Sequence, residues 1–83
     1  MTKYIVATSN GGLMECPEVY YDKFQLIEAD SEDLARKMYN DKNNCKYFYG
    51  VVICEYTEDN AWILDERIIS ENLMKHLKRV LIW

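Results

Sequence analysis

The sequence predicts an α+β domain in which two helices cover a four-stranded antiparallel sheet. Four stretches are rich in β-branched and aromatic residues, and two others have apolar residues at helical spacing. These segments follow the order β-β-α-β-β-α along the chain. The chain has 83 residues, of which 49% are hydrophobic, and this is enough for a single domain, residues 1–83, with its own core.

The first strand is expected at residues 3–9 (KYIVATS), where β-branched and aromatic side chains are concentrated. Asn10-Gly11-Gly12 follows it. Asn and Gly tolerate positive φ angles, so we expect a tight turn there and no phosphate-binding loop. Strand character returns at residues 19–29, with an irregularity at Asp22-Lys23. The first strand and residues 24–29 can therefore lie side by side and antiparallel.

The first helix follows directly and has the clearest signals in the sequence. Asp30 and Ser31 are favourable N-cap residues, and two acidic residues follow in the first turn, where the helix dipole stabilises negative charge. Asn43-Asn44 marks its expected end. The helix would bury one apolar stripe, formed by Leu34, Ala35, Met38 and Tyr39.

A long strand is expected at residues 46–57 (KYFYGVVICEYT). Both of its faces are largely apolar, which is typical of a central strand, and Gly50 predicts either a bulge or the close approach of a helix. Residues 57–60 would turn the chain, and residues 61–69 (AWILDERII) would return as the hairpin partner. The second helix would begin at Ser70 and close the core with its own apolar stripe.

From residue 24 onward, this order is a split βαβ unit without its last strand. The first strand can fill the vacant position. We therefore infer a circularly permuted ferredoxin-like two-layer sandwich, with strand order 1-2-4-3 and both helices on one face. A looser α+β arrangement with a shorter sheet is the alternative. The uncovered face would form an aromatic interface, lined by Tyr47, Tyr49, Val51 and Ile53, with Tyr4 and Val6 beside them.

Composition and charge exclude several functional classes. Lys and Arg number 10 against 14 Asp and Glu, and the net charge of −4 opposes nucleic-acid binding. The three cysteines, Cys16, Cys45 and Cys54, form no C-x-x-C pair, and their odd number favours free thiols in a reducing cytoplasm. The chain shows no signal-peptide pattern and no apolar run of about 18 residues, so we expect no membrane association.

The sequence shows no catalytic or metal-binding pattern. Its one histidine, His76, lies on the polar face of the predicted last helix, and the cysteines lack the spacing of zinc ligands. We therefore expect no enzymatic activity, no cofactor and no metal. Five carboxylates gather around the predicted hairpin, which is a solvated turn, a patch that meets a basic partner, or a weak cation site: Glu55, Glu58, Asp59, Asp65 and Glu66.

A small, acidic, Tyr-rich chain without an active site resembles the accessory proteins of bacteriophages and other mobile elements. Many of those bind and block a host or defence protein, and the resemblance implies a place in the host cytoplasm. The sequence thus predicts a non-enzymatic protein-binding domain, an inhibitor or adaptor. Tyr47 and Tyr49 would anchor the partner, and three carboxylates would steer it: Glu55, Glu58 and Asp59. The alternative is a homodimer that binds a small ligand in the groove between two open sheet faces.

Overall fold

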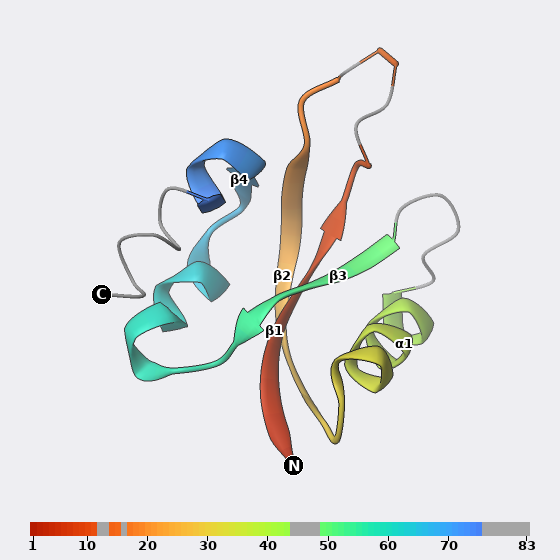
Figure 1. The fold of residues 1–83 in the computed structure, drawn as a ribbon, viewed down its shortest axis with the longest axis vertical. Helices are drawn as coiled ribbons and strands as arrows, with labels where there is room; N and C mark the ends of the chain where they lie inside the picture. The colour runs from red at the N-terminus through yellow and green to blue at the C-terminus, as the bar shows by residue number, and fades with distance from the viewer. Residues whose placement is uncertain (12–13, 16, 44–48, 76–83) are drawn as a thin grey trace.

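A computed structural model of the chain describes residues 1–11, 14–15, 17–43 and 49–75. Its elements appear in Figure 1 in chain order: β1 (Thr2–Ser9), β2 (Tyr20–Ala29), α1 (Glu32–Asn43), β3 (Tyr49–Glu55), the 3-10 helix η1 (Glu58–Asp65) and β4 (Ile68–Ser70). A helical turn follows at residues 71–75, and the rest of the predicted second helix lies outside the described residues. The predicted α+β class is confirmed.

The four strands form one antiparallel sheet in the order β3-β1-β2-β4. The predicted pairing of the first strand with residues 24–29 is confirmed, because Thr2 lies opposite Ala29 and Val6 lies opposite Gln25. The expected order 1-2-4-3, which the permuted ferredoxin-like arrangement requires, is wrong. The two central strands are β1 and β2, and β1 pairs with β3 on its other side. Because β3 is an edge strand, the central strand predicted from the two apolar faces of residues 46–57 is also wrong.

The predicted hairpin between residues 46–57 and 61–69 does not form. Residues Glu58–Asp65 are a 3-10 helix, and only Ile68–Ser70 form a strand, which pairs with β2. A capping box explains the difference, because the Thr57 hydroxyl accepts from the backbone N–H of Asn60 while the Asn60 side chain accepts from the backbone N–H of Thr57. This arrangement starts a helical turn where a hairpin turn was expected.

The helix α1 packs on one face of the sheet. Its buried residues Ala35 and Tyr39 join a cluster that also contains four sheet residues: Tyr4, Val6, Ile27 and Ala29. The expectation that Tyr4 and Val6 line an open face is therefore wrong, because their side chains are 6% and 0% exposed beneath α1.

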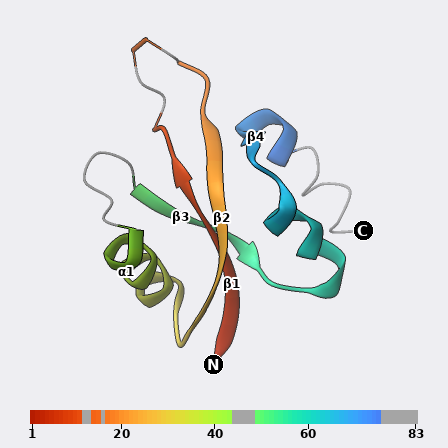
Figure 2. The same cartoon turned by 180° about the vertical axis from the view of Figure 1, so that it is seen from behind.

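The 3-10 helix η1 and the turn at residues 71–75 lie on the opposite face, as Figures 1 and 2 show. The cluster there contains Ile5, Ala7, Phe24, Ile53, Ile63, Ile69 and Met74. Side chains alternate along β1, which divides its residues between the two clusters. The sheet and α1 form the predicted two-layer sandwich. However, the second helical region covers the other face, and Ile53, expected to be open, is buried there.

The irregularity predicted in the second strand is confirmed. In β2, Thr8 lies opposite Asp22 and Val6 lies opposite Gln25, so Lys23 and Phe24 together face one residue of β1 and form a bulge. The φ angle of Lys23 is 53°, in the left-handed region. Gly11 also has a positive φ angle, of 65°, as expected for its turn.

Gly50 marks the close approach of α1 to β3, one of its two predicted roles. A Cβ atom at this position would lie 2.6 Å from Cδ1 of Tyr39 and 2.9 Å from Oδ1 of Asn40. The backbone N–H of Gly50 donates to Asn40 Oδ1 at 2.8 Å, and Nε of Arg36 donates to the Gly50 carbonyl at 3.2 Å. The helix thus satisfies the outward backbone groups of this edge strand at Gly50.

Candidate functional site

Five carboxylates gather along residues 55–66, which we call the acidic segment. All five are exposed: Glu55, Glu58, Asp59, Asp65 and Glu66. Within the part of the chain that the structure describes, the one salt bridge joins Lys75 to Glu71 at 3.9 Å. No described cation therefore forms a salt bridge with the acidic segment, and its charge faces solvent.

Asn60 fixes the start of the acidic segment. Its Oδ1 accepts from the backbone N–H of Thr57 at 2.7 Å, and its Nδ2 donates to the Glu55 carbonyl at 2.7 Å and to Sγ of Cys54 at 3.4 Å. These contacts connect the end of β3 to the first turn of η1. The exposed carboxylates of Glu55, Glu58 and Asp59 consequently project from a backbone that is held in one conformation.

Two aromatic side chains alternate with these carboxylates. Tyr56 and Trp62 are half-buried and pack against the cluster around Ile63, which leaves part of each ring accessible. Partly exposed Tyr and Trp side chains among charged residues are typical of protein interfaces. The predicted anchors stay a prediction, because Tyr47 lies outside the described residues and only the backbone of Tyr49 is described.

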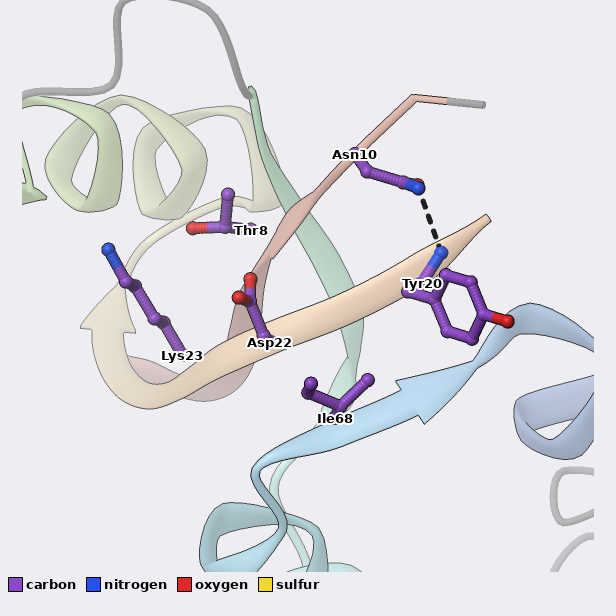
Figure 3. Close-up of a pocket in the computed structure, with 6 residues that line it drawn as sticks. All are labelled: Thr8, Asn10, Tyr20, Asp22, Lys23 and Ile68. Carbon is purple, nitrogen blue, oxygen red and sulfur yellow. Dashed lines mark hydrogen bonds between the residues drawn. The ribbon is translucent and has the colours of Figure 1, made fainter. Parts of the chain in front are cut away.

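A pocket of about 390 Å³ lies on the α1 face of the sheet, beside the region that the helix covers. Figure 3 shows its lining residues: Thr8, Asn10, Tyr20, Asp22, Lys23 and Ile68. Ile68 precedes Ile69, which is buried in the opposite cluster, so alternation places Ile68 on the α1 face. We call this hollow the β4 pocket.

The bulge in β2 gives the β4 pocket a pair of opposite charges. Consecutive residues of a regular strand point to opposite faces, but Asp22 and Lys23 both line the pocket because the left-handed backbone at Lys23 breaks the alternation. Neither side chain forms a hydrogen bond or an ion pair with another residue of the described ranges. The carboxylate and the ammonium group are therefore available at the pocket surface.

Tyr39 links α1 to this pocket. Its hydroxyl donates to the Lys23 carbonyl at 2.8 Å. Because a phenol has one hydrogen, the 2.6 Å contact between the hydroxyls of Tyr39 and Thr8 must be donated by Thr8. The Tyr39 side chain is fully buried, so the helix holds both the bulge and one wall of the pocket in place.

Tyr21 follows Tyr20 in β2 and packs against the cluster on the opposite face. Burial raises the pKa of the Tyr21 hydroxyl, and the negative charge of Glu71 and a hydrogen bond to it raise that pKa further. Each of these effects disfavours the ionised phenolate. Tyr21 is therefore a neutral hydrogen-bond donor and a poor candidate for a nucleophile.

The described residues contain no group of three or more His, Cys, Asp or Glu side chains that could hold a metal ion. They also contain no helix with the length and apolar character needed to cross a membrane. Cys54 is half-buried beside Asn60. The predictions made for Cys16, Cys45 and His76 fall on residues that lie outside the described ranges.

Comparisons with protein-family models, with curated proteins and with solved structures found no match. The resemblance to bacteriophage accessory proteins therefore stays a prediction. The functional argument rests on two surfaces of the molecule, the acidic segment and the β4 pocket. Sequence reasoning found the first and missed the second, for which the irregularity at Asp22-Lys23 was the only signal.

Proposed function

We propose that this chain is a non-enzymatic protein-binding domain, an inhibitor or adaptor, that occludes a basic surface of its partner with the acidic segment. The main support is the exposure of Glu55, Glu58 and Asp59 without a salt-bridge partner among the described residues. Carboxylates that the chain itself does not neutralise are available to a cationic partner. The net charge of −4 would add long-range attraction.

Charge alone gives orientation and a fast encounter, whereas affinity comes mainly from buried aromatic contacts. Tyr56 and Trp62 lie within the acidic segment and keep part of their rings exposed. In the proposed complex they act as anchors while the surrounding carboxylates pair with Lys or Arg side chains. Tyr47 and Tyr49 would extend this contact. The complex would form in the cytoplasm, with a host or defence protein as partner if the chain is encoded by a bacteriophage.

A capture experiment with a charge-matched control tests the proposal. We expect the wild-type chain, immobilised and exposed to a bacterial lysate, to retain a basic protein at about 50 mM salt and to lose it at about 500 mM salt, because salt screens exposed charges. The variant E55Q/E58Q/D59N should retain at least about tenfold less of that protein. The control E15Q/E28Q/D41N removes the same charge from three other exposed positions and should behave as the wild type.

Equal capture by the two triple variants would contradict the role of the acidic segment, as would capture that does not depend on salt. The substitution Asn60→Ala adds a second test, because it keeps every charge but removes the contacts to Thr57 and Glu55. If the fixed arrangement of carboxylates matters, this variant should bind more weakly than the wild type while its net charge stays at −4.

A further inference from the structure

We propose that the β4 pocket binds a small zwitterion with an apolar side chain, that is, a free aliphatic or aromatic α-amino acid. The pocket volume of about 390 Å³ falls within the usual range for small-ligand sites, roughly 300–1,000 Å³. The pocket is separate from the acidic segment, so this site is an addition to the proposed protein-binding function and does not depend on it.

The charges of Asp22 and Lys23 select this class of ligand. Both side chains line the pocket, and they are too far apart to form a salt bridge with each other. A zwitterion can place its ammonium group against Asp22 and its carboxylate against Lys23, which satisfies two charges that lack partners among the described residues. A simple amine or a simple acid would satisfy only one of them.

The backbone supports the same inference. Lys23 adopts a φ angle of 53°, which is unfavourable for a residue with a Cβ atom. Strained backbone positions of this kind are found preferentially at ligand sites. With regular strand geometry, the adjacent side chains of Asp22 and Lys23 would point to opposite faces of the sheet, and only one of them could line the pocket. The bulge instead brings both charged side chains to the pocket, and the Tyr39 hydroxyl fixes the backbone of the bulge by donating to the Lys23 carbonyl.

The remaining lining residues suit the other parts of an amino acid. Ile68 is 63% exposed at the sheet edge, and an apolar ligand side chain would cover it beside the ring of Tyr20, as Figure 3 indicates. The Thr8 hydroxyl donates its hydrogen to Tyr39 and keeps a lone pair for a ligand ammonium group. Asn10 accepts from the backbone N–H of Tyr20 at 2.9 Å and so fixes the outer wall.

A titration followed by ¹H–¹⁵N NMR tests the site on the wild-type chain. We expect L-phenylalanine and L-leucine to shift the amide signals of Thr8, Asp22, Lys23 and their pocket neighbours, with a dissociation constant on the order of 1 mM for ligands of this size. Phenethylamine lacks the carboxylate and 3-phenylpropionate lacks the ammonium group. Each should bind at least about tenfold more weakly than L-phenylalanine.

Two variants locate the charges. Asp22→Asn and Lys23→Asn each remove one charge, and Asn tolerates the positive φ angle at position 23; both should lower the affinity for L-phenylalanine about tenfold. Asp41→Asn and Lys37→Asn make the same charge changes at exposed positions of α1. These two control variants should bind L-phenylalanine with the affinity of the wild type. The proposal is overturned if neither amino acid shifts the pocket amides, if the singly charged analogues bind equally well, or if the pocket variants match their controls. Any of these results leaves the acidic-segment proposal standing.

Discussion

The two faces of the sheet hold their helical segments in different ways. On one face, α1 is attached by directional contacts, through the hydroxyl of Tyr39 and the side chains of Arg36 and Asn40. On the other face, η1 and the turn at residues 71–75 contribute Ile63 and Met74 to an apolar cluster. Hydrogen bonds depend on distance and angle, so they hold a helix in one position on the sheet. Apolar burial is not directional, because its free energy depends mainly on the area removed from water.

The β4 pocket lies beside the region of the sheet that α1 covers. The contacts of Arg36 and Asn40 to Gly50 draw α1 toward β3, at one edge of the sheet. β4 lies at the opposite edge, where Ile68 stays largely exposed. A helix placed by apolar burial alone would gain by covering Ile68. The polar attachment of α1 thus leaves part of its face available for a ligand.

The largest expected effect tests the apolar face. Ile63 of η1 is 2% exposed, whereas Ile68 of β4 is 63% exposed. We expect Ile63→Ala to lower the free energy of unfolding by about 2–5 kcal/mol, because it removes buried methyl groups and leaves a cavity. The same substitution at Ile68 should change it by less than about 0.5 kcal/mol. Urea unfolding followed by circular dichroism measures both values.

The outcome decides whether η1 is part of the core. A loss below about 1 kcal/mol for Ile63→Ala would mean that the segment can leave the sheet at little cost. The acidic segment would then lack the fixed backbone on which the proposed function depends.

A smaller effect is expected on the α1 face. Gly50→Ala should lower the free energy of unfolding by about 1–3 kcal/mol, because the new Cβ would contact Tyr39 and Asn40 at less than 3.0 Å. Gly11→Ala is the matched control. Among the described residues, no atom lies within 4 Å of a Cβ placed at Gly11, and the positive φ angle alone should cost about 1 kcal/mol.

NMR spectra of the two glycine variants separate crowding at α1 from backbone strain. Through Tyr39, Gly50→Ala should shift the amide signals of Thr8 and Lys23 in the β4 pocket, whereas Gly11→Ala should leave the Lys23 signal in place. Unshifted pocket signals in a destabilised Gly50→Ala variant would show that α1 and the pocket are independent.

The elements that could be predicted from the sequence are those with local signals. The N-cap residues Asp30 and Ser31 placed α1 correctly, and the bulge beside Lys23 and the close approach at Gly50 followed from residue type. Each of these features is decided by neighbours in the chain or by the shape of one residue. The predicted apolar stripe was correct only in part, because Ala35 and Tyr39 are buried while Leu34 and Met38 are 40% and 43% exposed.

The elements that could not be predicted depend on distant contacts. Residues 61–69 read as a strand because they are apolar and contain β-branched residues, yet the capping box of Thr57 and Asn60 makes most of them helical. The neighbours of a strand in a sheet are chosen by packing over the whole domain, so β1, expected at an edge of the sheet, lies between β2 and β3. The β4 pocket collects residues from three strands, and no single stretch of sequence contains it.

The smallest expected effect concerns the polar end of the apolar face, where Tyr21 meets Glu71. The folded-state pKa of Tyr21 is raised above its unfolded value of about 10, first by burial and then by Glu71. A raised pKa contributes stability that is fully present below about pH 10 and is lost as the pH rises through the folded-state pKa. Phenylalanine has no hydroxyl to ionise, so the Tyr21→Phe variant should not lose this contribution to stability at high pH.

Urea unfolding of the wild type and of Tyr21→Phe, from about pH 8 to about pH 11.5, isolates this contribution, because the other tyrosines and the lysines titrate in both proteins. We expect the difference in free energy of unfolding between the wild type and Tyr21→Phe to be constant at the low-pH end of this range. At the high-pH end, the wild type should lose stability relative to Tyr21→Phe. Glu71→Gln should reduce that shift, since it removes the charge and leaves the burial of Tyr21. The shift should be modest, because a half-exposed hydroxyl is partly screened by water. A constant difference over the whole range would mean that Tyr21 is not held against Glu71, and that the end of the apolar face near β4 is as open as the pocket behind it.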